Sequence, residues 1–475
     1  MLREPRPGTT HTTRRKAREE KHLVALLGPA FVAAIAYVDP GNVAANISAG
    51  ATYGYLLVWV LVAASAMAVV VQYLSAKLGI VTGRSLPQLL GDRLSRPSRL
   101  AYWAQAEIIA AATDLAEVVG GAIALHILFG VPMLVGGVII AAVSMVLLAV
   151  RSRHGARRFE QVVVVLLVLI TAGFVAGLFV SPFSWADAAA GLVPRFEGSR
   201  SVLLAASMLG ATVMPHAIYA HSDLARERFA EPGGAHPNGS GTAGHGSAGP
   251  GSGGPDAADF DAASPGTASP DAAAEATARD RRIRRLLRAT RWDVLLALAV
   301  AGSVNVAMLL LAAASLGPGN AFGTDATGAE TETIAGAHAA ISAVLGPVIG
   351  AAFGIGLLIS SLASTSVGSY AGAGIMQGLL RIRVPLLVRR AVTLLPALAV
   401  LALGIDATWA LVLSQVVLSI GIPFALIPLV RLTGSRRVMG GFADRMPLKL
   451  IAGTVTAAIV ALNVLLLVLI VLGDG

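Results

Sequence analysis

Apolar runs of roughly 20 residues follow one another along most of the chain, the length that spans a bilayer as an α-helix. The strict alternation of a transmembrane barrel strand is absent. The pattern predicts an all-α integral membrane protein. Its eleven predicted membrane helices lie at about 24–51, 54–77, 101–126, 131–150, 160–181, 199–222, 291–316, 347–378, 386–403, 407–430 and 448–472, with a short extra helix at 331–345.

Proline interrupts two of these helices, the first and the sixth. The first break is Asp39-Pro40-Gly41-Asn42, and the second is Met214-Pro215-His216, with unwinding near 211–215. Proline inside a helix removes a backbone donor and clashes with the preceding turn, which costs about 3 kcal/mol. Because lipid offers no partner to the freed carbonyls, such breaks are expected where they line a binding site. Pro40, Gly41 and Pro215 are the predicted hinges.

The positions of the breaks indicate an internal repeat. Helices 1–5 and 6–10 form two sets of five, and an odd number of crossings gives the second set the opposite orientation. Each break then lies in the first helix of its set, so both are expected at one site near the bilayer midplane. The predicted organisation is a tail at 1–22, helices 1–6 at 23–230, a disordered insertion at 231–278 and helices 7–11 at 279–475. The insertion is rich in Gly, Ala, Pro and Ser, which bury too little apolar surface to fold.

Composition and charge fit this topology. The chain is 55% hydrophobic and 13% charged, with a mean hydropathy of +0.74. Of its 36 Lys and Arg residues, 34 fall on one side of the predicted membrane and only Arg195 and Arg200 on the other. This asymmetry predicts a cytoplasmic N-terminus and an extracellular or periplasmic C-terminus. The Ala-, Gly- and Arg-rich composition favours a bacterial plasma (inner) membrane. Despite the net charge of +9, neither a nucleic-acid partner nor an obligate protein partner is expected.

The side chains at the breaks are metal ligands. The chain has no cysteine, which excludes thiolate ligands, disulfides and iron–sulfur clusters. Asp39 and Asn42 offer oxygens, Met214 offers a thioether, and unwinding frees carbonyls at Ala36 and Ala211. Oxygen alone suits Mg²⁺, Ca²⁺ or Mn²⁺, whereas a thioether favours transition metals. The set predicts a site for Mn²⁺ or Fe²⁺; the alternatives are a structurally paired carboxylate and a methionine that only fills the core.

Two more polar residues lie near the predicted site. His216 is a metal ligand, a proton acceptor or a buried structural histidine, and imidazole titrates near physiological pH. Gln415, in the tenth predicted helix, either joins the ion site or forms a hydrogen bond between helices.

Helix 3 carries three acids on one narrow stripe. Glu107, Asp114 and Glu117 are spaced by seven and three residues, and acids at membrane depth are costly unless they line water or meet cations. They predict a proton route, with Arg389 and Arg390 as partners. The alternatives are a static salt-bridge network for the acids and orientation charges for the arginines.

Taken together, these motifs resemble the NRAMP (natural resistance-associated macrophage protein) family. The resemblance runs from about Gly28 to Val430, apart from 231–278. The matching motifs are Gly28-Pro29-Ala30-Phe31, Tyr37 to Asn42, Ser75 to Gly79, Thr113 to Glu117 and Gly210 to His216. The resemblance implies a leucine-transporter-type fold with two inverted five-helix repeats, discontinuous helices 1 and 6, and an eleventh helix. The chain departs from the family at two positions: Ser65 stands where members usually have Asn, and Ala217 where they have a polar residue, often Asn. Either departure could alter coupling or conformational balance without removing the site.

The resemblance also implies a function and roles. It implies proton-coupled import of divalent transition metals by alternating access, with the ion as substrate and no resident cofactor. The implied metal ligands are Asp39, Asn42, Met214 and the carbonyls of Ala36 and Ala211, with Gln415 approaching in the occluded state. The implied proton route uses His216, Glu107, Asp114, Glu117, Arg389 and Arg390. Segments 24–38 and 216–222 are expected to swing.

Three rival functions remain at the level of sequence. A carrier of the same fold for Mg²⁺ or an amino acid is one, although an amino-acid carrier needs no thioether. A membrane enzyme would need a nucleophile–base pair or a histidine cluster, which the sequence lacks. A passive channel would need repeated polar rings along a pore, whereas the polar groups here converge on one level.

Overall fold

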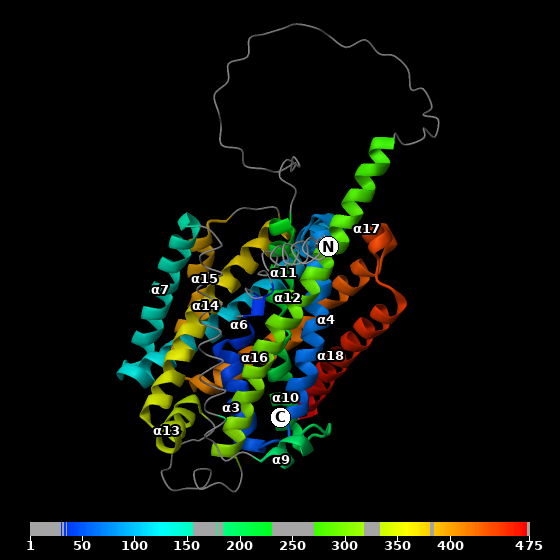
Figure 1. Ribbon diagram of the computed structural model, residues 1–475. Coiled ribbons are helices and arrows are strands. Elements are labelled where there is room, and N and C mark those ends of the chain that lie inside the picture. Colours follow the sequence, from blue (N-terminus) through cyan, green and yellow to red (C-terminus); the bar gives the residue numbers. More distant parts are fainter. Residues whose placement is uncertain are drawn as a thin grey trace, which may run out of the picture.

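The structure is a computed structural model of the chain and describes residues 30, 33–34, 36–154, 178, 184–229, 270–317, 333–380 and 384–472. In these residues helices build a single bundle (Figure 1). Seven described segments are long and apolar enough to cross a membrane. They are α4 (Val58–Thr82), α6 (Arg96–Phe129), α10 with α11 (Gly198–Phe229), α12 from Thr277 to Leu316, α14 (Pro347–Leu380), α16 (Ala407–Thr433) and α18 (Met446–Leu472).

Other predicted spans appear as shorter helices. The first is represented by α3 (Pro40–Tyr53), the fourth by α7 (Met133–His154) and the ninth by α15 (Leu386–Ala402). The fifth predicted span, 160–181, lies outside the described residues apart from Leu178, as does the tail 1–22, so the total of eleven stays a prediction. The extra helix expected at 331–345 is α13 (Ile334–Leu345). Short elements that the sequence did not predict are α5 (Leu86–Arg93), α9 (Trp185–Ala190), α17 (Arg436–Met439) and the 3₁₀ turn η2 (Gly440–Phe442).

One predicted boundary is wrong. Helix α12 (Pro270–Leu316) begins before the predicted end of the insertion, so 270–278 is helical, while 231–269 lies outside the described residues. The reason is local, because Asp-Ala-Ala-Ala-Glu-Ala follows Pro270. Proline fits the first helical position, and Ala and Glu are strong helix formers.

The packing of the helices is duplicated between the two halves of the chain. Helix α3 packs against α12, which is predicted helix 1 against predicted helix 7. The corresponding pair in the other half, predicted helix 6 against predicted helix 2, is α11 against α4. Likewise α6 contacts α15, and α14 contacts α7. The central pair, α6 and α14, are the third helices of the two halves. This pairing is what two inverted repeats produce.

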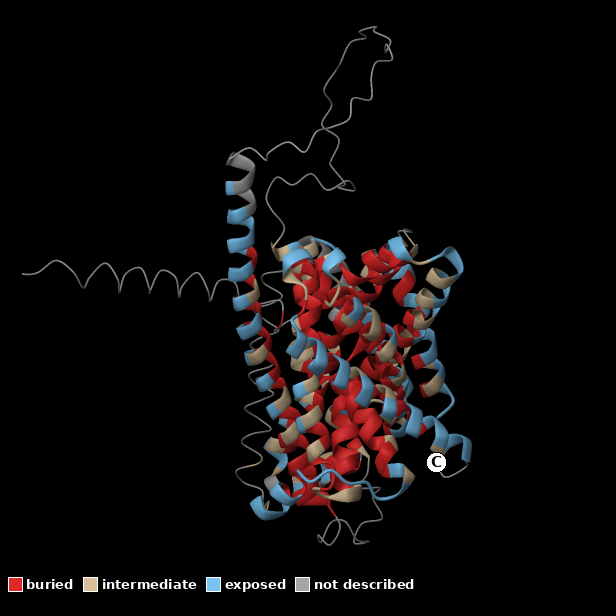
Figure 2. Cartoon of the chain, turned by 90° about the vertical axis from the view of Figure 1, so that its right-hand side faces the viewer, coloured by how far each residue is buried: buried red, intermediate tan, exposed pale blue. Residues whose placement is uncertain are grey.

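Burial separates a packed, mainly apolar interior, which also holds polar side chains, from an apolar exterior. Buried residues follow the middle of the bundle, and exposed residues cover its outer faces (Figure 2). Large apolar side chains are exposed along α7, α15 and α18, for example Val138, Val392 and Val471. In water such a surface would be unfavourable, but it matches hydrocarbon. Asp39, Asn42, His216 and Gln415 instead lie in the buried interior.

Candidate functional site

The first break lies slightly before the predicted one. A 3₁₀ turn, η1 (Ala36–Val38), ends at Asp39, and α3 begins at Pro40. Asp39 is the N-cap residue, and its side chain accepts a hydrogen bond from the Asn42 backbone N–H. Gly41 and Asn42, predicted to be unwound, are therefore in the first helical turn. The physical reason is that proline suits the first helical position and Asp suits the N-cap.

Asp39 and Asn42 meet the second break directly. Asp39 Oδ1 accepts from the Asn42 backbone N–H at 2.8 Å and from Asn42 Nδ2 at 3.0 Å. Asn42 Nδ2 also donates to the Ala211 carbonyl at 2.8 Å. Asp39 Oδ2 and Asn42 Oδ1 are buried, and neither has a hydrogen-bond partner in the part of the chain that the structure describes. Two oxygens of the type that binds divalent cations thus remain unsatisfied where the two halves of the chain meet.

Other helices hold the carbonyls of the first break. Asn305 Nδ2 of α12 donates to the Tyr37 carbonyl at 2.9 Å, and the Ser360 hydroxyl of α14 donates to the Val38 carbonyl. Asn46 Nδ2 in turn donates to Asn305 Oδ1 at 3.2 Å. The sequence analysis missed these three residues. A polar side chain within an apolar helix was the available signal, since it needs a partner inside the bundle.

The second break contains Met214. Two residues, Val213 and Met214, separate the end of α10 (Gly198–Thr212) from the start of α11 (Pro215–Phe229), and the Val213 N–H caps α10 by donating to the Leu209 carbonyl at 2.7 Å. Met214 lies in this gap and is fully buried. Met214 comes three residues after Ala211, whose carbonyl accepts a hydrogen bond from Asn42.

Gln415 lies against the first break. A Cβ added to Gly41 would lie 1.7 Å from Gln415 Nε2, so the amide occupies the space that glycine leaves. A Cβ on Gly210 would lie 2.0 Å from the Gln415 carbonyl, so α10 and α16 also approach closely there. Within the described part of the chain, the amide donates only to Ser414 of its own helix, at 3.2 Å, and Gln415 Oε1 has no partner. Of the two predicted roles, this arrangement favours a place beside the ion site.

The assembled donor set contains one acid only. Among the described residues, Asp39 Oδ2, Asn42 Oδ1 and Gln415 Oε1 are buried acceptors without a hydrogen-bond partner, and Met214, in the gap between α10 and α11, is a buried thioether. No group of three or more His, Cys, Asp or Glu side chains placed to hold a metal ion occurs among the described residues. A mixed oxygen and thioether site is therefore the arrangement this region offers, which fits a transition metal better than Mg²⁺ or Ca²⁺.

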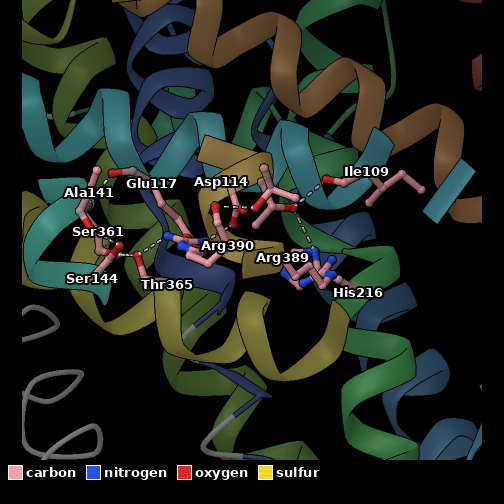
Figure 3. Close-up of polar contacts among 12 residues, drawn as sticks. Ile109, Asp114, Glu117, Ala141, Ser144, His216, Ser361, Thr365, Arg389 and Arg390 are labelled. Carbon is pink, nitrogen blue, oxygen red and sulfur yellow. Dashed lines mark hydrogen bonds and ion pairs between the residues drawn. The ribbon is translucent and has the colours of Figure 1, made fainter. Parts of the chain in front are cut away.

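His216 connects the second break to α6. Its Nδ1 lies 3.2 Å from the Thr113 hydroxyl, which also contacts the Ile109 carbonyl at 3.0 Å (Figure 3). When the Thr113 hydroxyl donates its hydrogen to the Ile109 carbonyl, its oxygen accepts a hydrogen bond from His216 Nδ1–H. In that tautomer of the neutral ring, Nε2 carries no proton and is an acceptor. Nε2 is buried and has no hydrogen-bond partner among the residues that the structure describes. Thr113 directly precedes Asp114, so it joins the histidine to the acidic stripe.

The acids of α6 and the arginines of α15 are paired. Arg389 binds Glu107 through two bonds, Nε to Oε1 at 3.1 Å and Nη2 to Oε2 at 3.0 Å. Arg390 lies between the other two acids and bonds Asp114 Oδ1 and, at 3.1 Å, Glu117 Oε2 (Figure 3). The side chains of Arg390 and Glu117 are 1% and 0% exposed, so this is a desolvated network.

One carboxylate oxygen in the network is left over. Glu117 Oε1 is buried and has no hydrogen-bond partner within the described ranges, while Arg390 Nη2 donates to the Thr365 hydroxyl of α14 at 3.4 Å. The Ser361 hydroxyl donates to the Glu117 carbonyl. The two alternatives predicted from the sequence, a salt-bridge network and a proton route, involve the same side chains. In a proton route, Glu117 Oε1 would be the atom that receives the proton, because the other oxygen of this carboxylate is bonded to Arg390.

A second polar chain, which the sequence analysis missed, ties the segment before the first break to α4 and α11. Gln72 Nε2 donates to the Tyr37 hydroxyl at 2.5 Å, and Gln72 Oε1 lies 2.8 Å from His221 Nδ1. All three residues are buried. The two departures noted in the sequence have simple surroundings: Ser65 packs against Gly302, and Ala217 is fully buried.

The chain is similar to known membrane transporters in both sequence and structure. The profile of the natural resistance-associated macrophage protein-like family, Nramp, matches residues 30–469. The "Divalent metal cation transporter MntH" of Mycobacterium tuberculosis is 53% identical over 457 residues, covering 94% of this chain and 92% of its own. A crystal structure of the Eremococcus coleocola manganese transporter has a TM-score of 0.73 at 26% identity and covers 97% of this chain and 88% of that one.

A more distant structure supports the architecture alone. MHP1, described as a nucleobase-cation-symport-1 family transporter, has a TM-score of 0.52 at 13% identity, covering 93% of this chain and 92% of its own. These likenesses establish the leucine-transporter-type fold that the sequence predicted. The matching proteins carry the names of transporters and not of enzymes. The chain therefore belongs to the Nramp family of membrane transporters.

Proposed function

We propose that this protein imports divalent transition metal ions, with Mn²⁺ and Fe²⁺ preferred, by proton-coupled alternating access. The observation that carries the proposal is a set of three buried acceptors that have no hydrogen-bond partner among the described residues, Asp39 Oδ2, Asn42 Oδ1 and Gln415 Oε1, together with the buried Met214 of the second break. Leaving a buried acceptor unsatisfied costs about 1–3 kcal/mol, so three at one place are best explained by a bound cation. The names of the relatives, a divalent metal cation transporter and a manganese transporter, agree with this.

The ligand set explains the proposed selectivity. Asp39 supplies the negative charge, and Asn42, Gln415 and the carbonyls of Ala36 and Ala211 supply neutral oxygens. The Ala211 carbonyl accepts from Asn42 Nδ2, but a carbonyl oxygen has a second lone pair for an ion. The thioether of Met214 binds soft ions well and replaces water poorly for Mg²⁺ or Ca²⁺, which prefer oxygen. Met214 is thus the residue that discriminates.

Proton coupling is supported by the path from His216 to Glu117. His216 directly follows Met214-Pro215, and its Nε2 has no hydrogen-bond partner among the described residues. Its Nδ1 contacts Thr113, the residue before Asp114. From there Arg390 links Asp114 to Glu117, and Arg389 holds Glu107. A divalent ion entering beside Asp39 repels a proton on that carboxyl, and His216, in the second break, is the proposed acceptor.

The proposed topology has the basic end of the bundle in the cytoplasm. The start of α12, α17 and the start of α18 lie at one end, and α9 and α13 at the other (Figure 1). The first end carries Arg279 to Arg291 and Arg431 to Lys449, whereas Arg195 and Arg200 lie next to α9 and α10. Lys and Arg are retained on the cytoplasmic side, so the N-terminus is inside and the C-terminus outside.

Opening toward the cytoplasm would require the segment before the first break to move. That segment is held by the Tyr37, Gln72 and His221 chain and by the Ala30 N–H, which donates to Asp293 Oδ2 at 3.0 Å. We propose that this segment and α11 swing about the residues before Pro40 and Pro215, where helical hydrogen bonding is interrupted.

The test is Mn²⁺ uptake into proteoliposomes with and without an inward proton gradient, together with a pH-sensitive dye inside the vesicles. We expect uptake that the gradient stimulates, internal acidification with Mn²⁺, and resistance to competing Ca²⁺ that Met214→Ala loses. Leu413→Ala, on an exposed face of α16, is the control and should behave as wild type. Absence of Mn²⁺ uptake under every gradient would refute the function and favour the Mg²⁺ or amino-acid alternative, and uptake without acidification would refute coupling alone.

A further inference from the structure

A polar cavity is lined by α17, η2, the loop that follows them and the start of α18, far along the chain from both breaks. Its volume is about 690 Å³, and its lining includes Arg436, Asp444, Arg445, Met446 and Lys449, with the glycines of η2. A Cβ built on Gly440 or Gly441 would meet nothing within 4 Å. The glycines therefore leave room at the mouth of the cavity, which is large enough for a phosphate ester and its substituent.

The cavity is strongly cationic. Arg436, Arg445 and Lys449 are exposed, and none of them forms an ion pair in the part of the chain that the structure describes. The one acid in the lining, Asp444, is neutralised, because its Oδ1 lies 2.5 Å from Lys77 Nζ of α4 and its side chain is 1% exposed. Three free cations thus face the cavity without a carboxylate to balance them, which is the chemistry that recognises phosphate.

The cavity also borders an apolar surface. Met446 lines it and is 67% exposed, and Leu450 and Ile451, one turn further along α18, are 60% and 50% exposed. Helix α18 is the most apolar of the described spans, with a mean hydropathy of 3.0. Basic side chains and exposed aliphatic side chains therefore meet at the point where α18 begins, as they do at the interface of a bilayer.

The wall of the cavity is fixed to a second helix. The Arg284 guanidinium of α12 lies 5.9 Å from the centre of the Phe442 ring in η2. The Lys77–Asp444 ion pair fixes the other side to α4, and the Asp444 N–H bonds the Thr433 carbonyl of α16 at 3.0 Å. These contacts hold the loop between α17 and α18 in place, so the cavity is a formed site.

We propose that this cavity binds the headgroup of an anionic phospholipid, with the acyl chains along the exposed face of α18. Arg436, Arg445 and Lys449 would bind the phosphate, and Met446 and Leu450 would contact the first methylenes. Inorganic phosphate shares the charged part of this chemistry, but only a lipid uses the apolar border. The proposal does not depend on the transported ion.

The experiment uses full-length protein, delipidated in a neutral detergent and titrated with phosphatidylglycerol, with phosphatidylcholine of the same chain length, or with inorganic phosphate. Bound lipid is counted by native mass spectrometry, and stabilisation is followed by the fluorescence of the 5 Trp residues. The test variant carries Arg436→Gln, Arg445→Gln and Lys449→Gln. The control carries Arg281→Gln, Arg285→Gln and Arg288→Gln, three exposed arginines of α12 that do not line the cavity.

We expect one phosphatidylglycerol to bind in preference to phosphatidylcholine, and the test variant to bind it at least tenfold more weakly, since each basic residue near an anionic headgroup contributes about 1 kcal/mol. The control variant should keep wild-type affinity. Equal weakening in both variants would overturn the proposal in favour of diffuse attraction. Inorganic phosphate that binds and stabilises as well as phosphatidylglycerol would overturn the assignment to a lipid.

Discussion

Substitution of Gly41 tests whether the Gln415 amide occupies the first break. A methyl group there would lie 1.7 Å from Gln415 Nε2 and 2.3 Å from Cδ, whereas ordinary contact begins at 3.4 Å. The amide must therefore retreat by roughly 1.7 Å, the difference between 3.4 and 1.7 Å. Overpacking of this kind costs about 1–3 kcal/mol, of which about 1 kcal/mol is offset because alanine favours helix more than glycine.

The prediction is that Gly41→Ala lowers both the melting temperature and Mn²⁺ uptake, and that Gln415→Ala relieves much of the loss in melting temperature. The coupling between the two sites should be on the order of 1–2 kcal/mol in favour of the double variant. Gly453→Ala is the matched control, because its Cβ would meet nothing within 4 Å. Melting is followed by the fluorescence of the 5 Trp residues. Equal effects of Gly41→Ala with and without the Gln415 side chain would refute the geometry.

Three further predictions concern the interior of the bundle. Gly210→Ala should destabilise the protein more than Gly41→Ala, because its Cβ would meet the backbone of α16 at 2.0 Å and no side chain can yield; a melting temperature equal to wild type would contradict this. Arg390→Leu should cost about 3–5 kcal/mol by leaving two acids unpaired, and Arg389→Leu less, because Glu107 is 19% exposed; chemical unfolding in detergent compares them. Thr113→Val should reduce gradient-driven uptake while Mn²⁺ binding by calorimetry stays unchanged, since it removes the hydroxyl that contacts His216 and the Ile109 carbonyl but none of the proposed metal ligands; weakened Mn²⁺ binding would count against the proton role.

The features that the sequence predicted well are those set by local chemistry. A run of apolar residues becomes a membrane helix whatever its neighbours, since its own backbone hydrogen bonds are closed within the run. The helices at 54–77, 347–378 and 448–472 appear within a few residues as α4, α14 and α18. Proline likewise fixes the breaks before Pro40 and Pro215, but the sequence placed the first unwound turn too late. Proline begins a helix as readily as it interrupts one, and only the N-cap at Asp39 distinguishes the two.

Pairing between distant residues was beyond the reach of the sequence. The Val38 carbonyl accepts a hydrogen bond from Ser360, 322 residues away, and the Tyr37 carbonyl accepts one from Asn305, 268 residues away. Arg390 could be proposed as a partner of the acidic stripe, but its position between Asp114 and Glu117 depends on how α15 packs against α6. The sequence by itself determined which residues carry charge, sulfur or amide groups, and which segments break. The tertiary structure decided which of these groups meet, because each contact is made by helices that are separated along the chain and brought together only by packing.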